Sequence, residues 1–196
     1  MKYLKMLGLA AIAAMALMAF VGAGTASATT LALGGVTQNS SVTLEATLES
    51  GTSATLKTTS GSFVDTCTQS TVKGSTEKPF TGTTVGGKVS ILSFGNCTHG
   101  TTVVKNGTLS VEWAGGTNGT VRSTGAEVEV ESTTFGAVLP CTTSSTHLGT
   151  LKGVSSTTEH ATLLVNAVVN CGFLAPTANW EAAYTVTSPT GLGVHE

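Results

Sequence analysis

Apolar and polar side chains alternate with a period of two along several stretches of the chain after residue 28. In residues 42–49 the apolar side chains occupy the even positions, and residues 126–131 and 178–186 repeat this pattern. A helix would spread such a pattern around its circumference, whereas a strand places it on one face. The pattern therefore predicts strands with one face packed and the other in water, roughly ten to twelve of them, and no helix after residue 28.

Two other segments, 89–94 and 163–169, are almost continuously apolar and predict central strands that are covered on both faces. Turns are expected between the strands. Asn106-Gly107 is a strong signal for a two-residue hairpin, and Asn118-Gly119 and Gly86-Gly87 predict further turns.

The first residues have the pattern of a signal peptide. Lys2 and Lys5 precede an apolar run over 6–21, and small residues follow at 26–28. The run is shorter than the roughly 20 residues that a membrane span needs. We expect a signal peptide over 1–28, cleavage after Ala28, and a secreted, extracellular mature chain of one domain, 29–196, with no membrane span.

Four cysteines lie in the mature chain, at Cys67, Cys97, Cys141 and Cys171. An even number of cysteines in an exported domain predicts disulfides, here two, for which three pairings are possible. Cys97 follows Cys67 at the same sequence separation at which Cys171 follows Cys141. This matched spacing favours Cys67–Cys97 and Cys141–Cys171.

The second cysteine pair repeats the first one further along the chain. When the chain is aligned with itself through these cysteines, residues 50–97 match residues 124–171 at 12 of 48 positions without a gap. The matches include Cys-Thr-x-Ser at Cys67 and Cys141. They also include the Asn that directly precedes the second cysteine of each pair. The sequence thus predicts one ancestral unit used twice, as 50–97 and 124–171.

Many short antiparallel strands with two disulfides predict an all-β fold. We expect an antiparallel β-sandwich, immunoglobulin-like or jelly-roll-like, with a closed barrel as the alternative. Trp113 and Trp180 lie on or at the end of alternating apolar segments, and we expect them in the core.

Charge and composition limit the function classes. The mature chain has seven Lys and Arg against eleven Asp and Glu, and no two of its cations are neighbours in sequence. Phosphate binding needs a clustered basic face, so no nucleic-acid partner is expected. Ser and Thr make up 54 of the 168 mature residues and predict an uncharged polar coat that faces water.

Catalytic and metal-binding patterns are not evident. A Ser-His-Asp triad would have to combine Asp65, the one aspartate, or a glutamate with His99, His147, His160 or His195, and the sequence has no Gly-x-Ser-x-Gly elbow. The glutamates that could form a carboxylate pair alternate with apolar residues and are expected on outward strand faces: Glu45, Glu49, Glu127, Glu129 and Glu131.

The sequence also lacks the patterns of metal and cofactor sites. The histidines and cysteines lack zinc-ligand spacing, and one aspartate does not make a calcium loop. We therefore assign no catalytic residue, metal or cofactor.

A family resemblance is carried by the leader end at 26–30, by Cys67-Thr68, and by residues 94–98, 118–123, 151–154 and 180–189. In these segments the chain resembles small secreted β proteins of actinobacteria that carry no assigned function. The resemblance covers the mature chain and implies no active site. Residues 91–94, Cys97, Leu109 and Trp113 carry a weaker resemblance to exported activators of alkane oxidation.

The function expected from the sequence is non-enzymatic binding outside the cell, because catalytic groups are scarce and β folds of this kind host many binding functions. The expected ligand is a surface glycan, an apolar small molecule held between the sheets, or another protein. The alternatives are an extracellular hydrolase with an unrecognised site and a structural coat component with no dedicated ligand.

Overall fold

All regular secondary structure in the described part of the chain is β-strand, which confirms the predicted fold class. The computed structural model describes residues 28–78, 82–133, 135–144 and 146–196, so most of the predicted signal peptide, at 1–27, lies outside it. Within these ranges no helix is long and apolar enough to cross a membrane. The strands are β1 (Thr30–Leu33), β2 (Val36–Thr37), β3 (Thr43–Leu48), β4 (Ala54–Thr58), β5 (Val64–Thr76), β6 (Thr84–Cys97), β7 (Thr101–Lys105), β8 (Thr108–Trp113), β9 (Gly119–Thr124), β10 (Glu127–Ser132), β11 (Ala137–Thr142), β12 (Thr146–Lys152), β13 (Thr162–Val169), β14 (Ala178–Ser188) and β15 (Leu192–His195).

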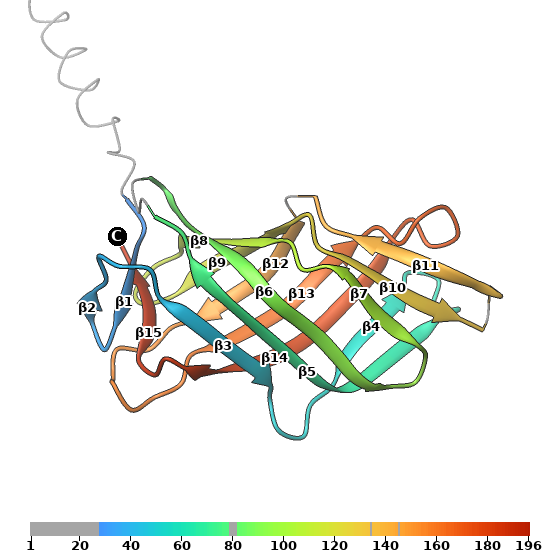
Figure 1. The fold of residues 1–196 in the computed structure, drawn as a ribbon, viewed down its shortest axis with the longest axis horizontal. Helices are drawn as coiled ribbons and strands as arrows, with labels where there is room; N and C mark the ends of the chain where they lie inside the picture. The colour runs from blue at the N-terminus through green and yellow to red at the C-terminus, as the bar shows by residue number, and fades with distance from the viewer. Residues whose placement is uncertain (1–27, 79–81, 134, 145) are drawn as a thin grey trace, which may run out of the picture.

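The main sheet closes on itself. Its strand order is β13-β12-β9-β8-β6-β5-β3-β14-β4, and β13 also pairs with β14. Eight antiparallel strands therefore form a ring, visible in Figure 1 as long, tilted strands around one axis. The structure has the closed-barrel alternative in place of the expected two-sheet sandwich. Alternation cannot separate these folds, because strands of both have one packed face.

One position in the ring is shared by two strands. β3 pairs with the Tyr184–Ser188 end of β14, and β4 pairs with the Ala178–Glu181 end. Both also pair with β5, so β3 and β4 act as one strand that is interrupted by the loop 49–53. Interruptions of this kind raise the number of strand segments above the predicted ten to twelve.

Two three-stranded sheets lie at opposite ends of the long axis in Figure 1. The sheet β15-β1-β2 joins the first and last strands of the described chain, and Thr30 pairs with His195. It buries Leu31 and Val194. The sheet β11-β10-β7 lies at the other end and buries Val130 and Leu139. Both ends of the barrel are therefore packed with apolar side chains.

The predicted inward faces are confirmed. Even-numbered apolar residues of β3 pack against the core, as do those of 126–131 and β14. The expectation of strands covered on both faces is wrong for 89–94 and 163–169, because Ile91 is 46% exposed and Val168 is 60% exposed. A wall one strand thick has a single covered face, and alternate residues must face outward.

Strand pairings recur when the two units are aligned through their cysteines. Ala54 pairs with Cys67, and the equivalent residues of the second unit, Val128 and Cys141, also pair. Leu48 pairs with Tyr184, and in the same alignment their equivalents, Arg122 and Ser110, pair as well. Each half of the chain contributes four positions to the ring. The first half contributes β3/β4, β5, β6 and β8, and the second half contributes β9, β12, β13 and β14. The common ancestry of the two units remains a prediction.

The predicted hairpin at Asn106-Gly107 is wrong, because β7 and β8 do not pair and belong to different sheets. The Asn106 side chain instead bonds to β6. Its Nδ2 donates to the Ser90 carbonyl at 2.9 Å, and its Oδ1 accepts from the Leu92 amide at 3.2 Å. The segment is a fork at which β7 leaves the barrel wall and β8 joins it.

The other two predicted turns have different outcomes. Asn118 belongs to the loop between the paired strands β8 and β9, and its amide donates to the Gly115 carbonyl, so this turn is confirmed. Gly86 and Gly87 lie inside β6, so the turn predicted there is wrong. A Cβ on Gly87 would lie 3.0 Å from the Ser75 carbonyl oxygen, so the close approach of β5 is what makes a glycine suitable there.

Candidate functional site: an apolar cavity in the barrel

The inside of the barrel holds two adjoining cavities, of about 90 Å³ and about 120 Å³. The walls of both are predominantly apolar, and together they include residues from all eight positions of the ring. Four side chains line both cavities and mark the place where they meet, which we call the waist: Val72, Val89, Leu109 and Leu163.

The first cavity lies toward the β11-β10-β7 end of the barrel, and the second lies toward the β15-β1-β2 end. Phe94, Val128 and Trp180 line the first, and Leu31 and Leu192 line the second. Gly74, Gly86 and Gly87 border the second cavity and contribute no side chain to fill it. Alternation supplies the apolar lining, and the glycines help to leave space unfilled.

Trp180 lies between the core and the first cavity. It is only partly buried, lines the first cavity and meets the ring of Phe94 edge-on at a centroid distance of 6.1 Å. Trp113 is also only partly buried, and its indole N–H donates to the Gly116 carbonyl at 2.9 Å. Both tryptophans pack against the core as predicted, but neither is enclosed by it.

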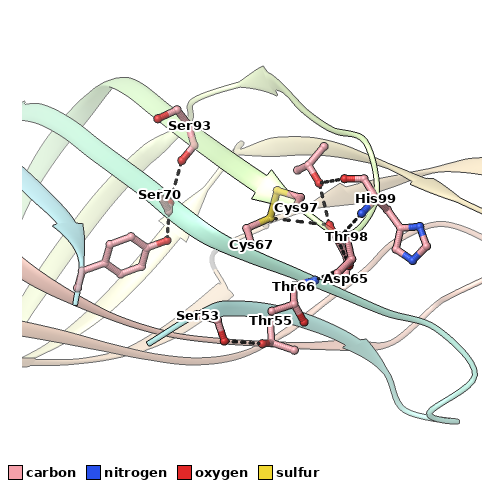
Figure 2. The surroundings of a disulfide bond; sticks show 12 residues. Ser53, Thr55, Asp65, Thr66, Cys67, Ser70, Ser93, Cys97, Thr98 and His99 are labelled. Carbon is pink, nitrogen blue, oxygen red and sulfur yellow. Dashed lines mark hydrogen bonds between the residues drawn. A yellow bond between two sulfur atoms is a disulfide. The ribbon is translucent and has the colours of Figure 1, made fainter. Parts of the chain in front are cut away.

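A buried hydroxyl pair lies on the wall of the first cavity. The Tyr184 hydroxyl is 2.9 Å from Ser70 Oγ, and Ser70 Oγ donates to the Ser93 carbonyl at 2.8 Å (Figure 2). Because the Ser70 proton is engaged, the phenol donates to Ser70 and its own lone pairs remain available. Burial raises the pKa of Tyr184 to about 12, and the Ser70 hydroxyl, which can turn to donate to a phenolate, opposes this shift.

The stability of the fold should fall as the pH rises from 10 to 12. Because the pKa of Tyr184 is about 12 in the folded chain against 10.0 for the free side chain, the folded state keeps a proton that the unfolded state loses. The contribution is full below pH 10 and is lost through this window, about 3 kcal/mol in all. Urea unfolding across this pH range measures it.

Tyr184 is the one tyrosine of the mature chain, since the other is Tyr3, so its ionisation can be followed directly by ultraviolet absorbance. The variant Tyr184→Phe is the control, and it should lack this part of the pH dependence. A phenolate midpoint near pH 10 in the folded protein would contradict the prediction.

Asp65 is buried beside the first disulfide (Figure 2). Its Oδ1 accepts from the Thr98 hydroxyl at 2.8 Å and from the His99 amide at 3.0 Å, and its Oδ2 accepts from the Thr101 hydroxyl at 2.7 Å. No cation pairs with it among the described residues. The carboxylate therefore fastens the turn between β6 and β7 to β5.

The same carboxylate is close to two sulfur atoms, since ligand atoms of Asp65, Cys67 and Cys97 lie within 4.8 Å of one another. Both sulfurs are in a disulfide and offer no thiolate, so this cluster is not a metal site of the thiolate type.

The candidate histidines are dispersed. The His99 main-chain amide donates a hydrogen bond to Asp65, and the His99 ring packs against the Phe63 ring at a centroid distance of 4.9 Å. The His160 ring is 2.8 Å from the Val186 carbonyl oxygen, and His147 lies exposed on β12. His195 has a buried Nε2 with no hydrogen-bond partner in the described structure.

The candidate glutamates either form ion pairs with lysines or are at least partly exposed to solvent. Glu45 pairs with Lys73 at 2.9 Å across β3 and β5, and Glu127 pairs with Lys105 across β10 and β7. Glu49 and Glu131 are exposed, and Glu129 is half-exposed. These glutamates are spread over several segments and are not brought together at one cavity.

Both predicted disulfides are present, Cys67–Cys97 and Cys141–Cys171. Cys67 and Cys141 line the first cavity from its two sides, and both are buried. Two disulfides indicate an oxidising environment.

The position and lining of the cavity are what the sequence reasoning missed, although an apolar ligand between the sheets is among its expectations. A signal is available at Gly74 and Gly87, which border the second cavity from neighbouring strands, but the Gly86-Gly87 pair predicts a turn instead. Comparisons with protein-family models, with characterised proteins and with solved structures found no match to this chain. The candidate site therefore rests on geometry and chemistry alone.

Proposed function

We propose that the protein is an exported, non-enzymatic binding protein that holds an apolar small molecule inside the barrel. The observation that carries the proposal is the pair of adjoining cavities with apolar walls drawn from every position of the ring. An eight-stranded barrel is wide enough either to be filled by its own side chains or to enclose one small ligand. Concave apolar sites with a few polar groups are the usual form of ligand pockets.

The polar groups of the cavity walls support binding in preference to catalysis. Asp65 is held by three hydrogen bonds from the protein, and Tyr184 is bonded to Ser70. Around the second cavity, Glu45 is paired with Lys73, and Lys88 with Glu77. A general base or an activated nucleophile needs a partner that transfers or holds its proton at the reaction centre. These groups are engaged in structural contacts instead.

Export is supported by the predicted leader and by the two disulfides. Thr29 would be the first residue after cleavage, and it is already part of the fold. Its side chain is buried, and its hydroxyl donates to the Thr83 carbonyl at 2.6 Å and accepts from the Trp113 amide at 3.0 Å. Cleavage after Ala28 would remove the leader without removing a residue that these contacts need.

An apolar ligand is favoured over a glycan because of where the tryptophans lie. Sugar rings stack on aromatic faces at a surface, whereas Trp180 borders the internal cavity and contacts Phe94. An apolar molecule in the same space would meet aromatic and aliphatic side chains on all sides.

The test is a titration of the secreted, oxidised protein with the neutral apolar dye N-phenyl-1-naphthylamine. We expect saturable binding of one dye per chain with increased emission. The variant Val128→Trp, on the cavity wall, should weaken it at least about tenfold. Val138→Trp is the matched control, because Val138 is 51% exposed on the neighbouring strand β11, and it should bind as the unmodified protein does.

Two results would contradict the proposal. One is the absence of saturable binding in the unmodified protein. The other is equal weakening by Val138→Trp, which would place the dye on the outer surface. Circular dichroism of both variants checks that the fold is kept.

A further inference from the structure

We propose that the ligand is a single unbranched alkyl chain with a small uncharged head, and that its head lies at the fork where β7 leaves the wall beside β6. This inference rests on the proposed binding function and specifies its ligand class. Three observations carry it: the shape of the interior, the gap in the wall and the chemistry of the rim.

The interior is divided into two adjoining cavities that share the four side chains of the waist. The waist joins two cavities of similar size, and Leu163 on β13 reaches it from the opposite wall to Val89 on β6. In the ring order, β13 and β6 are four positions apart among eight, so these side chains line the interior from opposite walls. An unbranched alkyl chain needs the least separation of these side chains to extend from one cavity into the other, whereas a fused ring system needs more.

The wall has a gap in the first half of the chain and none at the equivalent place in the second half. There, β13 and β14 pair continuously from Thr162↔Thr185 to Val169↔Ala178. In the first half, β8 pairs only with residues 84–88 of β6, and β7 pairs with β10 instead of with β6. The wall of the second half is thus fully paired, whereas the pairing in the first half is interrupted at the fork.

The first cavity extends to this interruption. Its lining includes Leu92 and Phe94 from the open edge of β6, and Thr101 and Asn106 from the segment that diverges. Leu92 and Phe94 are only partly buried, although both line the apolar interior. Asn106 holds the fork in place through Ser90 and Leu92, so the place at which the pairing is interrupted is fixed.

The rim, which is the polar part of the first cavity's lining near the fork, carries no positive charge. Thr142 and Thr143 line the first cavity together with Thr101 and Asn106, and no Lys, Arg or His is among the described residues of this lining. The one carboxylic acid there is Asp65, which has no cationic partner among the described residues. A negatively charged head would meet this carboxylate without compensation, so the rim suits a neutral head.

The ligand class is tested by displacement of N-phenyl-1-naphthylamine with three sets of compounds: 1-alkanols of increasing length, alkanoic acids of the same lengths, and compact ring alcohols of equal carbon number. For the alkanols we expect affinity to increase about fourfold per methylene, up to the length at which both cavities are filled. Alkanoic acids and ring alcohols should bind at least about tenfold more weakly at equal carbon number.

The path of the chain is tested at the waist. Val89→Phe should remove the gain from added methylenes beyond the first cavity, so that long alkanols bind no more tightly than those that fill the first cavity alone. Ile91→Phe is the matched control, because Ile91 lies on the same strand with its side chain exposed, and it should behave as the unmodified protein. An unchanged length profile in Val89→Phe would overturn the threading of the waist.

The position of the head is tested at the rim with Thr142→Lys, since Thr142 is exposed and borders the first cavity. We expect alkanoic acids to gain at least about tenfold relative to alkanols. Thr150→Lys, also exposed but outside the cavity lining, should not change this ratio. An equal ratio in both variants would show that the head of the ligand does not lie at the fork.

The outcomes separate this inference from the proposed function. Displacement of the dye by ring alcohols as strongly as by alkanols would refute the single-chain ligand and leave apolar binding intact. A dye that does not bind at all would refute both.

Discussion

Replacing Asp65 with leucine should lower the free energy of unfolding by roughly 3 to 5 kcal/mol. The buried carboxylate accepts from the Thr98 hydroxyl, the His99 amide and the Thr101 hydroxyl, and leucine accepts from none of them. The His99 amide and the Thr101 hydroxyl would lose their partner in a half-buried place, while Thr98 is exposed to water. Urea unfolding of the oxidised protein measures the change.

Two comparisons make this prediction sharper. Asp65→Asn should cost much less, because its amide oxygen can still accept at the place of Oδ1 and the Thr101 hydroxyl can turn to accept from the amide nitrogen. The residue at the same position in the second unit is Leu139, which is buried without such donors, so leucine is tolerated by the strand itself. An Asp65→Leu variant of unchanged stability would show that the turn after β6 does not depend on the carboxylate.

Removing either disulfide should cost roughly 3 to 4 kcal/mol, because each bridge closes a loop of about 30 residues in the unfolded chain. The double variants Cys67→Ala/Cys97→Ala and Cys141→Ala/Cys171→Ala serve as controls for each other, since the sequence separation is 30 in both pairs. Loop entropy alone predicts equal losses. Unfolding in urea under non-reducing conditions gives the two values.

A difference between the two disulfide variants would report contacts in the folded state. Cys67 lies two residues from Asp65, whereas Cys141 lies two residues from Leu139, and these surroundings are not equivalent. Stability unchanged by loss of one bridge would contradict the entropic account for that bridge.

Local chemistry was predictable where it depends on short-range pattern. The period of two placed Ala126, Val128 and Val130 on the inward face, and the structure packs all three against the core or beside it. The cysteine spacing predicted the pairing because each pair joins segments that lie together within one unit. Both inferences need only the strand period and the repeat.

Barrel closure was not predictable in this way, because it depends on pairs far apart in the sequence. The ring closes where β14 lies between β13 and β3, and Leu48 pairs with Tyr184 there. Strands with one packed face satisfy a sandwich and a barrel equally, so nothing in a single strand separates them. The cavity follows from closure, and it was missed for the same reason.

Asn106-Gly107 shows why a strong local signal can fail. The dipeptide favours a reversal when the strands on each side can pair. Here β7 pairs with β10 and β8 pairs with β6 and β9, so the same residues become a fork. The Asn106 side chain supplies the bonds to β6 that a neighbouring strand would have made.

The pairing of the first and last strands affects the order in which the chain can fold. β1 pairs with β15, so the end sheet is incomplete until the last strand is available. The ring closes only when β14 pairs with β3, so the barrel is also incomplete until late in the sequence. Contacts across such separations form slowly, because the chain must close a long loop before they stabilise it. A chain delivered from its N-terminus would therefore leave one edge of β3 unpaired until β14 is available, whereas β8 can pair with β9 much earlier, and this late closure suits the proposed export in an extended form.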